Sequence, residues 1–358
     1  MKRCCKTGKG LINQTPTLAT VFLFGALCLL SGCQSGDVIM DVPIKASQVG
    51  GYIDSSTTWT LELSPYQVIS PIIISPGAVL TIHPGVEVLF NWKMGFAILG
   101  SVVANGTTDS LIYFSVVDGV WNGLAFSGGP QDTLSSLTYC VIEYCNFGIV
   151  CDSLSSPHIE HCTIQNFTNV GIYIGYYAEP EIVNNDILNL VPGGGPTGIQ
   201  CDPFASPTLY GNHIQGHSRG IQCQYVSFTI VDSNYISDCD TGVYCYYTYN
   251  TTTIRNSEIT DNAVGISLYW SSPEITDNII TNNDKGIQGG SVSAPYIRRN
   301  DLSNNTWTYY NQTPNGVDAE QNWWGTTDST AIASGIYDYF DSTAYGIVDF
   351  IPILTSPP

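Results

Sequence analysis

The sequence has few charged residues, and very few of them are basic. Charged residues make up 11% of the 358, and 11 Lys and Arg stand against 30 Asp and Glu, for a formal net charge of −19. Four of the basic residues, Lys2, Arg3, Lys6 and Lys9, precede every acidic residue. Binding to nucleic-acid phosphates needs clustered Lys and Arg side chains. The composition therefore excludes a nucleic-acid partner, while a 43% hydrophobic share can supply a sizeable core.

A long hydrophobic run is also missing. The main apolar segment, Leu18–Leu30, has 13 residues, fewer than the roughly 18 that a membrane-spanning helix needs. Because basic residues precede it, the segment is typical of the core of an export signal. It ends in Leu30-Ser31-Gly32-Cys33, a run that resembles the lipobox of bacterial lipoproteins.

This resemblance implies that residues 1–32 are a lipoprotein signal peptide and that Cys33 is acylated as the first residue of the mature chain. Two acyl chains on one residue give stable membrane anchoring. Gln34 follows the cysteine where Asp would signal retention, which in the family's sorting pattern implies the outer membrane or the cell surface. An ordinary secretory signal with a chance cysteine is the alternative. Residues 33–55 lack a clear periodicity, and we expect them to form a tether.

Good helix formers are sparse, and no segment is long enough for a helical crossover between strands. Short segments instead alternate apolar and polar residues, which predicts strands with one buried face. A Gly followed by an aliphatic residue recurs about every 23 residues, at Gly123, Gly148, Gly171, Gly198, Gly220, Gly242, Gly265 and Gly286. A repeat that cannot bury its own face must stack on its neighbours.

A second signature, aliphatic-x-x-Asn-x-aliphatic, accompanies the repeats. In register its polar residues fall on one line: Asn185, Asn212, Asn234, Asn278, Asn300 and Asn322, with Cys140, Cys162 and Ser257 at further positions. A second line holds Asn262, Asn283 and Asn305. Stacked Asn side chains satisfy one another and the turn backbone. We expect Gly and Asn at the corners because both tolerate left-handed backbone angles.

These features predict an all-β parallel β-helix, a solenoid of coils of about 23 residues stacked about 4.8 Å apart. The segments Trp59–Phe90 and Asn322–Ser329, the latter reading NWWGTTDS, resemble the first coils and the last coil of right-handed parallel β-helix repeat proteins of the pectate-lyase-like superfamily. The right hand is implied by this resemblance. We expect N-terminal coils over 56–122, a repeat body over 123–324 and a C-terminal cap over 325–358.

The superfamily includes lyases, hydrolases and non-catalytic surface proteins, so the fold leaves function open. Lyases of this fold use a basic residue and cations, which an acidic chain lacks unless Ca²⁺ supplies the charge; no other cofactor is implied. Asp238 and Asp261 occupy equivalent positions on neighbouring coils, and carboxylates about 5 Å apart can act as an acid/base pair or bind a cation. The alternative is a turn ladder in which Asp replaces Asn.

Aromatic residues recur at fixed distances after the repeat glycines. The positions are Tyr173, Tyr176, Tyr225, Tyr244, Tyr246, Tyr247, Tyr269 and Trp270. If this face points outward, it forms an aromatic stripe suited to stacking on sugar rings. Aromatic stacking that only stabilises the sheet is the alternative.

Eight cysteines follow Cys33, and several share one position of the repeat. Cys151, Cys201, Cys223 and Cys245 stand three residues after the repeat glycine, a core position that a small buried thiol fills well. Disulfides between adjacent coils, Cys140 with Cys162 and Cys201 with Cys223, are the alternative in an exported chain. The spacing of His158, His161 and Cys162 matches no zinc pattern, so we predict no metal site.

The interpretation that fits these features is a lipid-anchored, non-catalytic surface module that binds carbohydrate or another surface along its aromatic, Asn-rich face. Its partners would be a polysaccharide or cell-surface glycan and, through the anchor, the membrane. A polysaccharide-degrading enzyme using Asp238 and Asp261 is the first alternative, so catalysis stays undecided. A purely structural or adhesive protein is the second.

Overall fold

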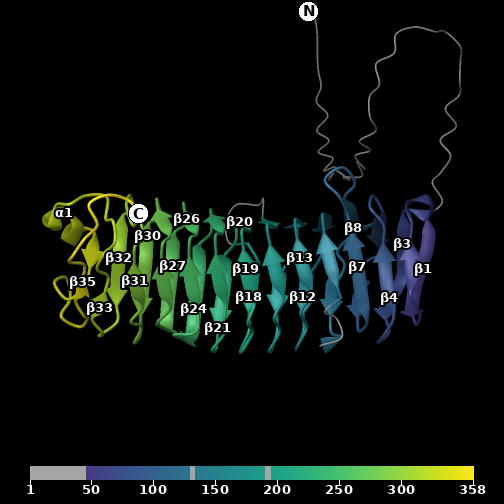
Figure 1. Cartoon of the computed structure of the whole chain (residues 1–358), viewed down its shortest axis with the longest axis horizontal. Coiled ribbons are helices and arrows are strands. Elements are labelled where there is room, and N and C mark those ends of the chain that lie inside the picture. The colour runs from purple at the N-terminus through teal and green to yellow at the C-terminus, as the bar shows by residue number, and fades with distance from the viewer. Residues whose placement is uncertain (1–45, 130–133, 190–194) are drawn as a thin grey trace, which may run out of the picture. The chain divides into compact units, whose positions relative to one another are not determined.

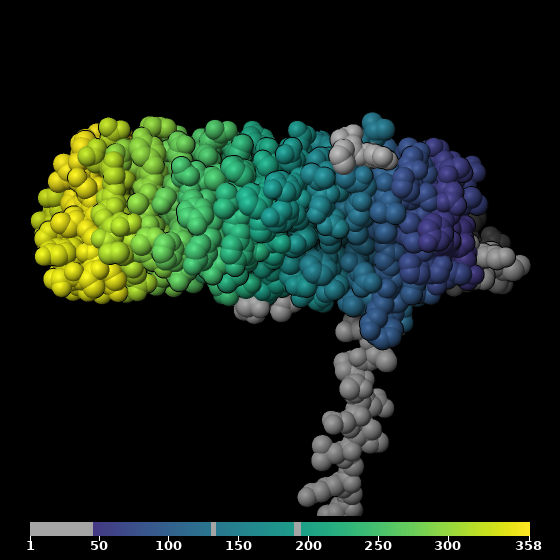
Figure 2. Space-filling view, turned by 90° about the horizontal axis from the view of Figure 1, so that it is seen from below, coloured from purple at the N-terminus to yellow at the C-terminus, as the bar shows by residue number. Residues whose placement is uncertain are grey.

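The computed structural model describes residues 46–129, 134–189 and 195–358. Within them, short parallel strands repeat in groups of three along the chain, and each group forms one coil that pairs with the coils before and after it (Figure 1). The strands line three faces, named A, B and C here. Figure 2 shows side chains of successive coils following one another in chain order. The predicted all-β parallel β-helix is confirmed.

Face A is a 13-stranded parallel sheet. Its strands are β2 (Thr57–Trp59), β4 (Val79–Ile82), β7 (Ser101–Asn105), β10 (Ser136–Thr138), β13 (His158–Glu160), β16 (Glu181–Val183), β19 (Thr208–Tyr210), β22 (Ile230–Asp232), β25 (Thr253–Arg255), β28 (Glu274–Thr276), β31 (Tyr296–Arg298), β33 (Val317–Asp318) and β35 (Val348–Asp349).

Faces B and C together form a 22-stranded sheet, because β1 (Ser47–Ile53) and β3 (Tyr66–Ile74) run across both. Face B contains β5 (Glu87–Phe90), β8 (Ile112–Val116), β11 (Cys140–Glu143), β14 (Thr163–Gln165), β17 (Asp186–Leu188), β20 (His213–Gln215), β23 (Tyr235–Ser237), β26 (Glu258–Thr260) and β29 (Ile279–Thr281).

Face C contains β6 (Phe96–Ile98), β9 (Leu124–Phe126), β12 (Phe147–Cys151), β15 (Val170–Ile174), β18 (Thr197–Cys201), β21 (Arg219–Gln224), β24 (Thr241–Tyr249), β27 (Val264–Ser271), β30 (Lys285–Gly290), β32 (Trp307–Gln312) and β34 (Ile336–Tyr337). The described helices are short: a 3₁₀ turn, η1 (Leu61–Leu63), and α1 (Ser329–Ser334).

Period-two alternation places one row of aliphatic side chains from each face inside the solenoid. On face B, Ile187, Ile214 and Ile236 are register partners on consecutive coils and are fully buried. Each buried aliphatic side chain contributes roughly 1.5–3 kcal/mol by leaving water. The inner rows therefore fix the register, which in turn fixes the neighbours of every outward side chain.

The first predicted asparagine line forms a continuous hydrogen-bonded ladder at the corner between faces A and B. Asn212 shows the pattern: its Nδ2 donates to Asn234 Oδ1 at 3.0 Å and to the Ile182 carbonyl at 2.9 Å. Its Oδ1 accepts the Asn185 backbone N–H at 3.0 Å. The second line, between faces B and C, joins Asn262, Asn283 and Asn305 in the same way.

The expected left-handed Asn and Gly do occur at the corners, at Asn184, Asn256 and Gly211 for example, but the ladder residues themselves are not left-handed. The left-handed residue stands one position before each ladder residue, as at Asn184 (φ 53°) and Asp277 (φ 58°). Apart from Gly123, with φ 93°, the repeat glycines have no positive φ, and they serve close approach instead. A Cβ at Gly220 would lie 2.6 Å from the Gly242 carbonyl oxygen, so only glycine lets neighbouring coils pair at this corner.

Both ends differ from the expected boundaries. Strand β1 lies inside the predicted tether, residues 33–55, and pairs in parallel with β3, so the solenoid begins earlier than predicted. In the predicted cap, β34 pairs with β32 and β35 with β33, so the cap continues the faces. Residues 1–32, which were predicted to be a signal peptide, and Cys33 lie outside the described residues. Among the residues described, no helix has the length and apolar character to span a membrane.

Candidate functional site

Three aromatic rings stack on face C, at the C-terminal ends of the strands β21, β24 and β27. Tyr225, Tyr247 and Trp270 occupy consecutive coils, with centroids 6.0 Å and 5.7 Å apart and planes 10° and 6° from parallel. Each has a left-handed backbone, with φ of 50–55°, because the chain turns sharply there. Tyr225 is 47% exposed and Trp270 is 37% exposed. The stack therefore presents a large apolar surface to solvent.

A second row of rings lies beside this stack. Tyr246 stacks on Tyr269 with centroids 5.4 Å apart and planes within 16°, and lies 6.1 Å from Tyr244. Tyr246 also meets Tyr225 and Tyr247 edge to face. Six of the eight predicted aromatic residues thus form one group, which we name the aromatic cluster: Tyr225, Tyr244, Tyr246, Tyr247, Tyr269 and Trp270.

The other two predicted rings lie outside the aromatic cluster. Tyr176 packs edge to face against Tyr177 and Phe204, at 4.8 Å and 5.3 Å. Tyr173 meets Phe147 edge to face and donates its hydroxyl hydrogen bond to Asp202. The face is consequently two aromatic groups separated by polar side chains. Tyr177 and Phe204 were missed, although both stand six residues after a repeat glycine.

A polar network fills the space between the two aromatic groups. Asp202 accepts hydrogen bonds from the amides of Gln200, at 2.9 Å, and Gln224, at 2.5 Å. Gln222 donates to Gln224 at 2.9 Å and accepts from the Arg219 guanidinium at 2.7 Å. This network is not predictable from the sequence, because its bonds join β18, β21 and the turn at Asp202 through the orientation of side chains on neighbouring coils.

The network contains one acidic side chain, Asp202, and one basic side chain, Arg219, and Arg219 connects it to the aromatic cluster. The Arg219 guanidinium lies over the Tyr244 ring, 4.3 Å from its centroid. Burial and the neighbouring Asp202 carboxylate raise the pKa of the Tyr173 hydroxyl, which keeps it a neutral donor. The surface therefore combines ring edges and faces with amide, carboxylate and guanidinium groups that can bond to hydroxyls.

Asp238 and Asp261 lie at the corner between faces B and C, apart from the aromatic cluster. Both are left-handed, with φ of 55° and 57°, as are Asn282 and Asn304 at the same corner on later coils. Asp238 accepts a hydrogen bond from Gln215 Nε2 at 2.7 Å, and Asp261 accepts one from Thr260 Oγ1 at 3.1 Å. The shared left-handed turn favours the alternative of a turn ladder in which Asp replaces Asn, and the catalytic role of the two residues stays a prediction.

The cysteine positions are core positions. Cys201, Cys223 and Cys245 are register partners, fully buried and free. Cys140, in β11, and Cys162, just before β14, are also buried and free, so the alternative disulfides between coils are not formed. Burial raises the pKa of the Cys145 thiol to about 12, which leaves it protonated and unreactive. Within 46–129, 134–189 and 195–358, no three His, Cys, Asp or Glu side chains are grouped to hold a metal ion.

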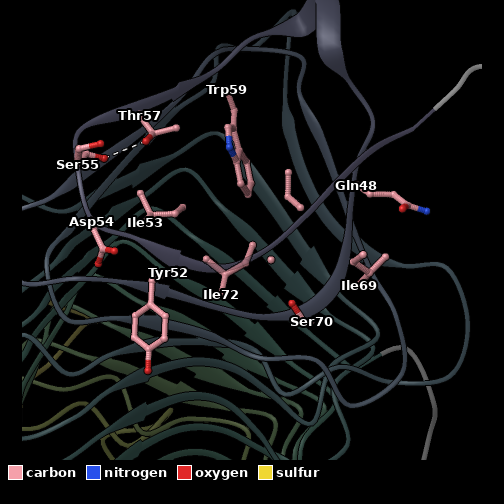
Figure 3. A pocket seen from close by; sticks show the side chains of 12 residues that line it. Gln48, Tyr52, Ile53, Asp54, Ser55, Thr57, Trp59, Ile69, Ser70 and Ile72 are labelled. Atoms are coloured by element: carbon pink, nitrogen blue, oxygen red, sulfur yellow. Dashed lines mark hydrogen bonds between the residues drawn. The ribbon is translucent and has the colours of Figure 1, made fainter.

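A pocket of about 540 Å³ lies at the N-terminal end of the solenoid (Figure 3). Strands β1, β2 and β3 and the turn at Asp54 and Ser55 line it, and the Trp59 ring stacks on Tyr66 with centroids 4.6 Å apart. None of the predicted site residues contributes to its lining. The pocket lies at the first coil, on which no earlier coil stacks among the described residues. Its lining does not support the carbohydrate-binding hypothesis.

Residues 132–276 match the family model described as "Right handed beta helix region". The chain carries a right-handed β-helix. The matched stretch of this β-helix contains Asp202, the polar network and the aromatic cluster. No curated protein matches the chain.

Solved structures resemble the β-helix in fold. A mutant of the periplasmic alginate epimerase AlgG is 13% identical, with 84% of this chain and 82% of that chain covered and a TM-score of 0.47. The A-module of the Azotobacter vinelandii mannuronan C-5 epimerase AlgE6 is 12% identical, with coverages of 87% and 91% and a TM-score of 0.46. A mutant tailspike protein of E. coli bacteriophage HK620, in complex with pentasaccharide, is 11% identical, with coverages of 77% and 58% and a TM-score of 0.45. At such low identities and TM-scores the likeness carries no argument about function.

Proposed function

We propose that this β-helix is a non-catalytic surface module that binds carbohydrate through the aromatic cluster and the polar network on face C. The observation that supports it most directly is the Tyr225–Tyr247–Trp270 stack, which keeps large rings in solvent beside a row of hydrogen-bonding side chains. Large exposed apolar patches with polar borders are typical of contact sites.

The chemistry of the surface suits a hydroxyl-rich ligand. Sugar rings present C–H groups that pack on aromatic side chains and hydroxyls that bond to amides and carboxylates. The Gln200, Gln222 and Gln224 amides and the Asp202 carboxylate lie next to the rings. Charge-driven binding of an acidic polysaccharide would instead need a basic surface, which a chain of net charge −19 does not supply.

The competing explanation is that the rings only stabilise the solenoid. Stacked aromatic pairs contribute about 0.5–1.5 kcal/mol each beyond the area they bury. The Tyr247 stack would therefore stabilise the folded protein even without a ligand. The two explanations separate in binding experiments. Stabilisation alone predicts a lower unfolding temperature for ring variants and no ligand in any assay.

The test is native affinity electrophoresis of residues 34–358 in gels that contain β-glucan, galactomannan, xylan, polygalacturonate or alginate, with and without Ca²⁺. We expect retardation without clearing of the polysaccharide, and a loss of about tenfold or more in affinity for the double variant Tyr247→Ala/Trp270→Ala, since about 1–3 kcal/mol of ring contact is removed. The matched control is Tyr210→Ala/Tyr296→Ala, which removes two exposed rings from face A.

Each outcome decides between the alternatives. Equal retardation of both double variants would contradict binding at the cluster. A cleared zone in the gel would indicate an enzyme, and Asp238→Asn/Asp261→Asn should then abolish clearing and leave folding intact, because Asn282 and Asn304 already stand at this corner. Unchanged mobility of the wild-type protein in every gel would favour the structural or adhesive alternative.

A further inference from the structure

One outward row of face C has no side chain at Gly290, at the edge of the aromatic cluster. In this row Tyr246 pairs with Tyr269, Tyr269 with Gly290, and Gly290 with Gln312. Gly290 therefore leaves a gap one coil wide between a tyrosine ring and a glutamine amide. Ser291, which follows it, has φ 55° and stands at the corner that Trp270 occupies one coil earlier.

The rings beside this gap, Tyr269 and Trp270, are stacked on one side only among the described residues. Tyr247 covers one face of the Trp270 ring, and no aromatic ring contacts the opposite face among the residues that the structure describes. Tyr269 is likewise stacked on the Tyr246 side only, and it is 39% exposed. Rings at the end of a stack are the ones whose faces remain available to a ligand.

The opposite wall is an oriented amide. Lys285 Nζ donates to Gln288 Oε1 at 3.2 Å, and Gln288 Nε2 donates to Gln312 Oε1 at 3.1 Å. Because this chain of bonds uses the Gln312 oxygen, the Gln312 Nε2 hydrogens remain as donors to a ligand oxygen. The Lys285 ammonium lies over the Tyr310 ring, 4.4 Å from its centroid, at the far end of strand β30 from Gly290.

The gap has room for one ring. Two coil spacings separate the strands on either side of β30, about 9.6 Å in total. A flat ring packs against each neighbour at about 3.5–4.0 Å, so one additional ring fits between the Tyr269 side and the Gln312 side.

We propose that Tyr269, Trp270, Gly290, Ser291 and Gln312 form a notch that holds a single neutral pyranose residue of a glycan. The sugar ring packs on the open faces of Tyr269 and Trp270, and Gln312 Nε2 donates to one of its oxygens. The class is neutral because none of the five residues carries a charge that would pair with a uronate. This inference rests on the proposed carbohydrate-binding function and adds to it the place and the class of the bound sugar.

Filling the notch is the test. A Cβ at Gly290 would lie 3.2 Å from the Leu268 carbonyl oxygen and 3.7 Å from Tyr269 Cδ2, and the residue has no positive φ, so a side chain there needs a shift of a few tenths of an ångström at the Leu268 carbonyl but no unusual backbone conformation. In the neutral β-glucan, galactomannan and xylan gels, we expect Gly290→Leu to weaken binding about tenfold or more. The matched control Gly316→Leu adds the same side chain at an exposed glycine outside the notch, where a Cβ would lie 3.5 Å from the Ile347 carbonyl oxygen, and it should change affinity less than about twofold.

A second variant separates the notch from folding. Ser291→Tyr would add a fourth ring to the Tyr225–Tyr247–Trp270 stack and cover the open face of Trp270. We expect its thermal midpoint to equal or exceed that of the wild-type protein, while its binding falls about tenfold or more. If Gly290→Leu does not fold, this variant alone decides.

The outcomes distinguish this inference from the function on which it rests. Wild-type affinity of Gly290→Leu and Ser291→Tyr, with loss of binding in Tyr247→Ala/Trp270→Ala, would overturn the notch and leave the binding function standing. Tighter wild-type binding to polygalacturonate or alginate than to every neutral polymer would overturn the neutral class. Absence of wild-type binding in all five gels would overturn both.

Discussion

Asparagine side chains close the corner between faces A and B. Asn278 is fully buried, and its oxygen accepts the Ser257 backbone N–H at 3.0 Å while its amide donates to the Ile254 carbonyl at 2.9 Å. It also donates to Asn300 Oδ1 at 3.0 Å, which continues the ladder. Each Asn thus satisfies backbone groups of two coils that no water reaches.

We expect Asn278→Ala to lower the free energy of unfolding by about 2–4 kcal/mol, because at least two buried backbone groups lose their partners. Chemical denaturation followed by circular dichroism measures this loss. The matched control is Asn122→Ala, since the exposed Asn122 amide makes one bond, to the Lys93 carbonyl at 2.9 Å, and its loss should cost under about 1 kcal/mol. Equal losses for both variants would contradict a structural role specific to the ladder.

The ladder residues were predictable from the sequence, and the residues of the polar network were not. A ladder position repeats in every coil, so the period alone aligns Asn278 with Asn300. Gln200 shares its register position with Gln222, but no period in the sequence indicates that Gln200 and Gln224 both bond to Asp202, because that depends on how side chains of neighbouring coils orient.

At the scale of elements, pairing between β31 and β33 brings a buried guanidinium to two carboxylates. The Arg298 side chain is 9% exposed and bonds to Asp318, with Glu320 at 3.5 Å. The pair of Arg299 with Asp277, at 2.7 Å, is much more exposed. A buried charge that loses its partner is costly, whereas an exposed pair contributes little.

The Arg298–Asp318 contact predicts a pH-dependent stability. The hydrogen bond from Arg298 lowers the pKa of the Asp318 carboxyl. A carboxyl whose pKa is lower in the folded than in the unfolded protein stabilises the fold above the unfolded-state pKa and loses that effect as pH falls through the folded-state pKa. We expect Asp318→Asn to lower the thermal midpoint near neutral pH by about 2 °C, with the difference vanishing in strong acid.

Thermal denaturation of the wild-type and Asp318→Asn proteins from about pH 2 to pH 7 measures this dependence. Asp277→Asn is the control, and it should show a much smaller difference at every pH because solvent screens the exposed Arg299 pair. A midpoint difference for Asp318→Asn that stayed constant down to the lowest pH would contradict the assignment.

At the scale of the whole molecule, a sequence that resembles a lipoprotein leader precedes the solenoid in the chain. The solenoid is described over residues 46–129, 134–189 and 195–358. We propose that this leader is processed as in lipoproteins, and an acylated Cys33 would then hold the proposed glycan-binding face near a membrane surface. A single acyl chain binds membranes only marginally, and stable attachment needs the two chains that a lipoprotein cysteine carries.

We expect the full-length chain, expressed in a bacterial host, to enter the detergent phase on Triton X-114 partitioning, and Cys33→Ser to remain in the aqueous phase. Cys28→Ser, which changes a cysteine within the predicted signal peptide, should partition as the wild-type protein does. Intact mass of the extracted protein identifies the acyl chains. Aqueous partitioning of the unaltered chain would favour the ordinary secretory signal.

The sequence by itself determined the architecture. Inward residues obey two strict periods, two residues within a strand and about 23 residues between coils, so Ile187, Ile214 and Ile236 could be aligned without coordinates. Their burial leaves one register. The parallel β-helix and both asparagine ladders follow from that alone.

Tertiary structure decided which outward side chains become neighbours. Outward residues obey no packing period, so the separation of Tyr176 from the aromatic cluster, the bonds of Asp202 and the gap at Gly290 depend on which coil stacks on which. The same holds for the glycines, whose purpose lies in the neighbouring coil: Gly220 was aligned correctly by the repeat, but the carbonyl of Gly242 that excludes a Cβ there comes from a residue 22 positions away in the chain.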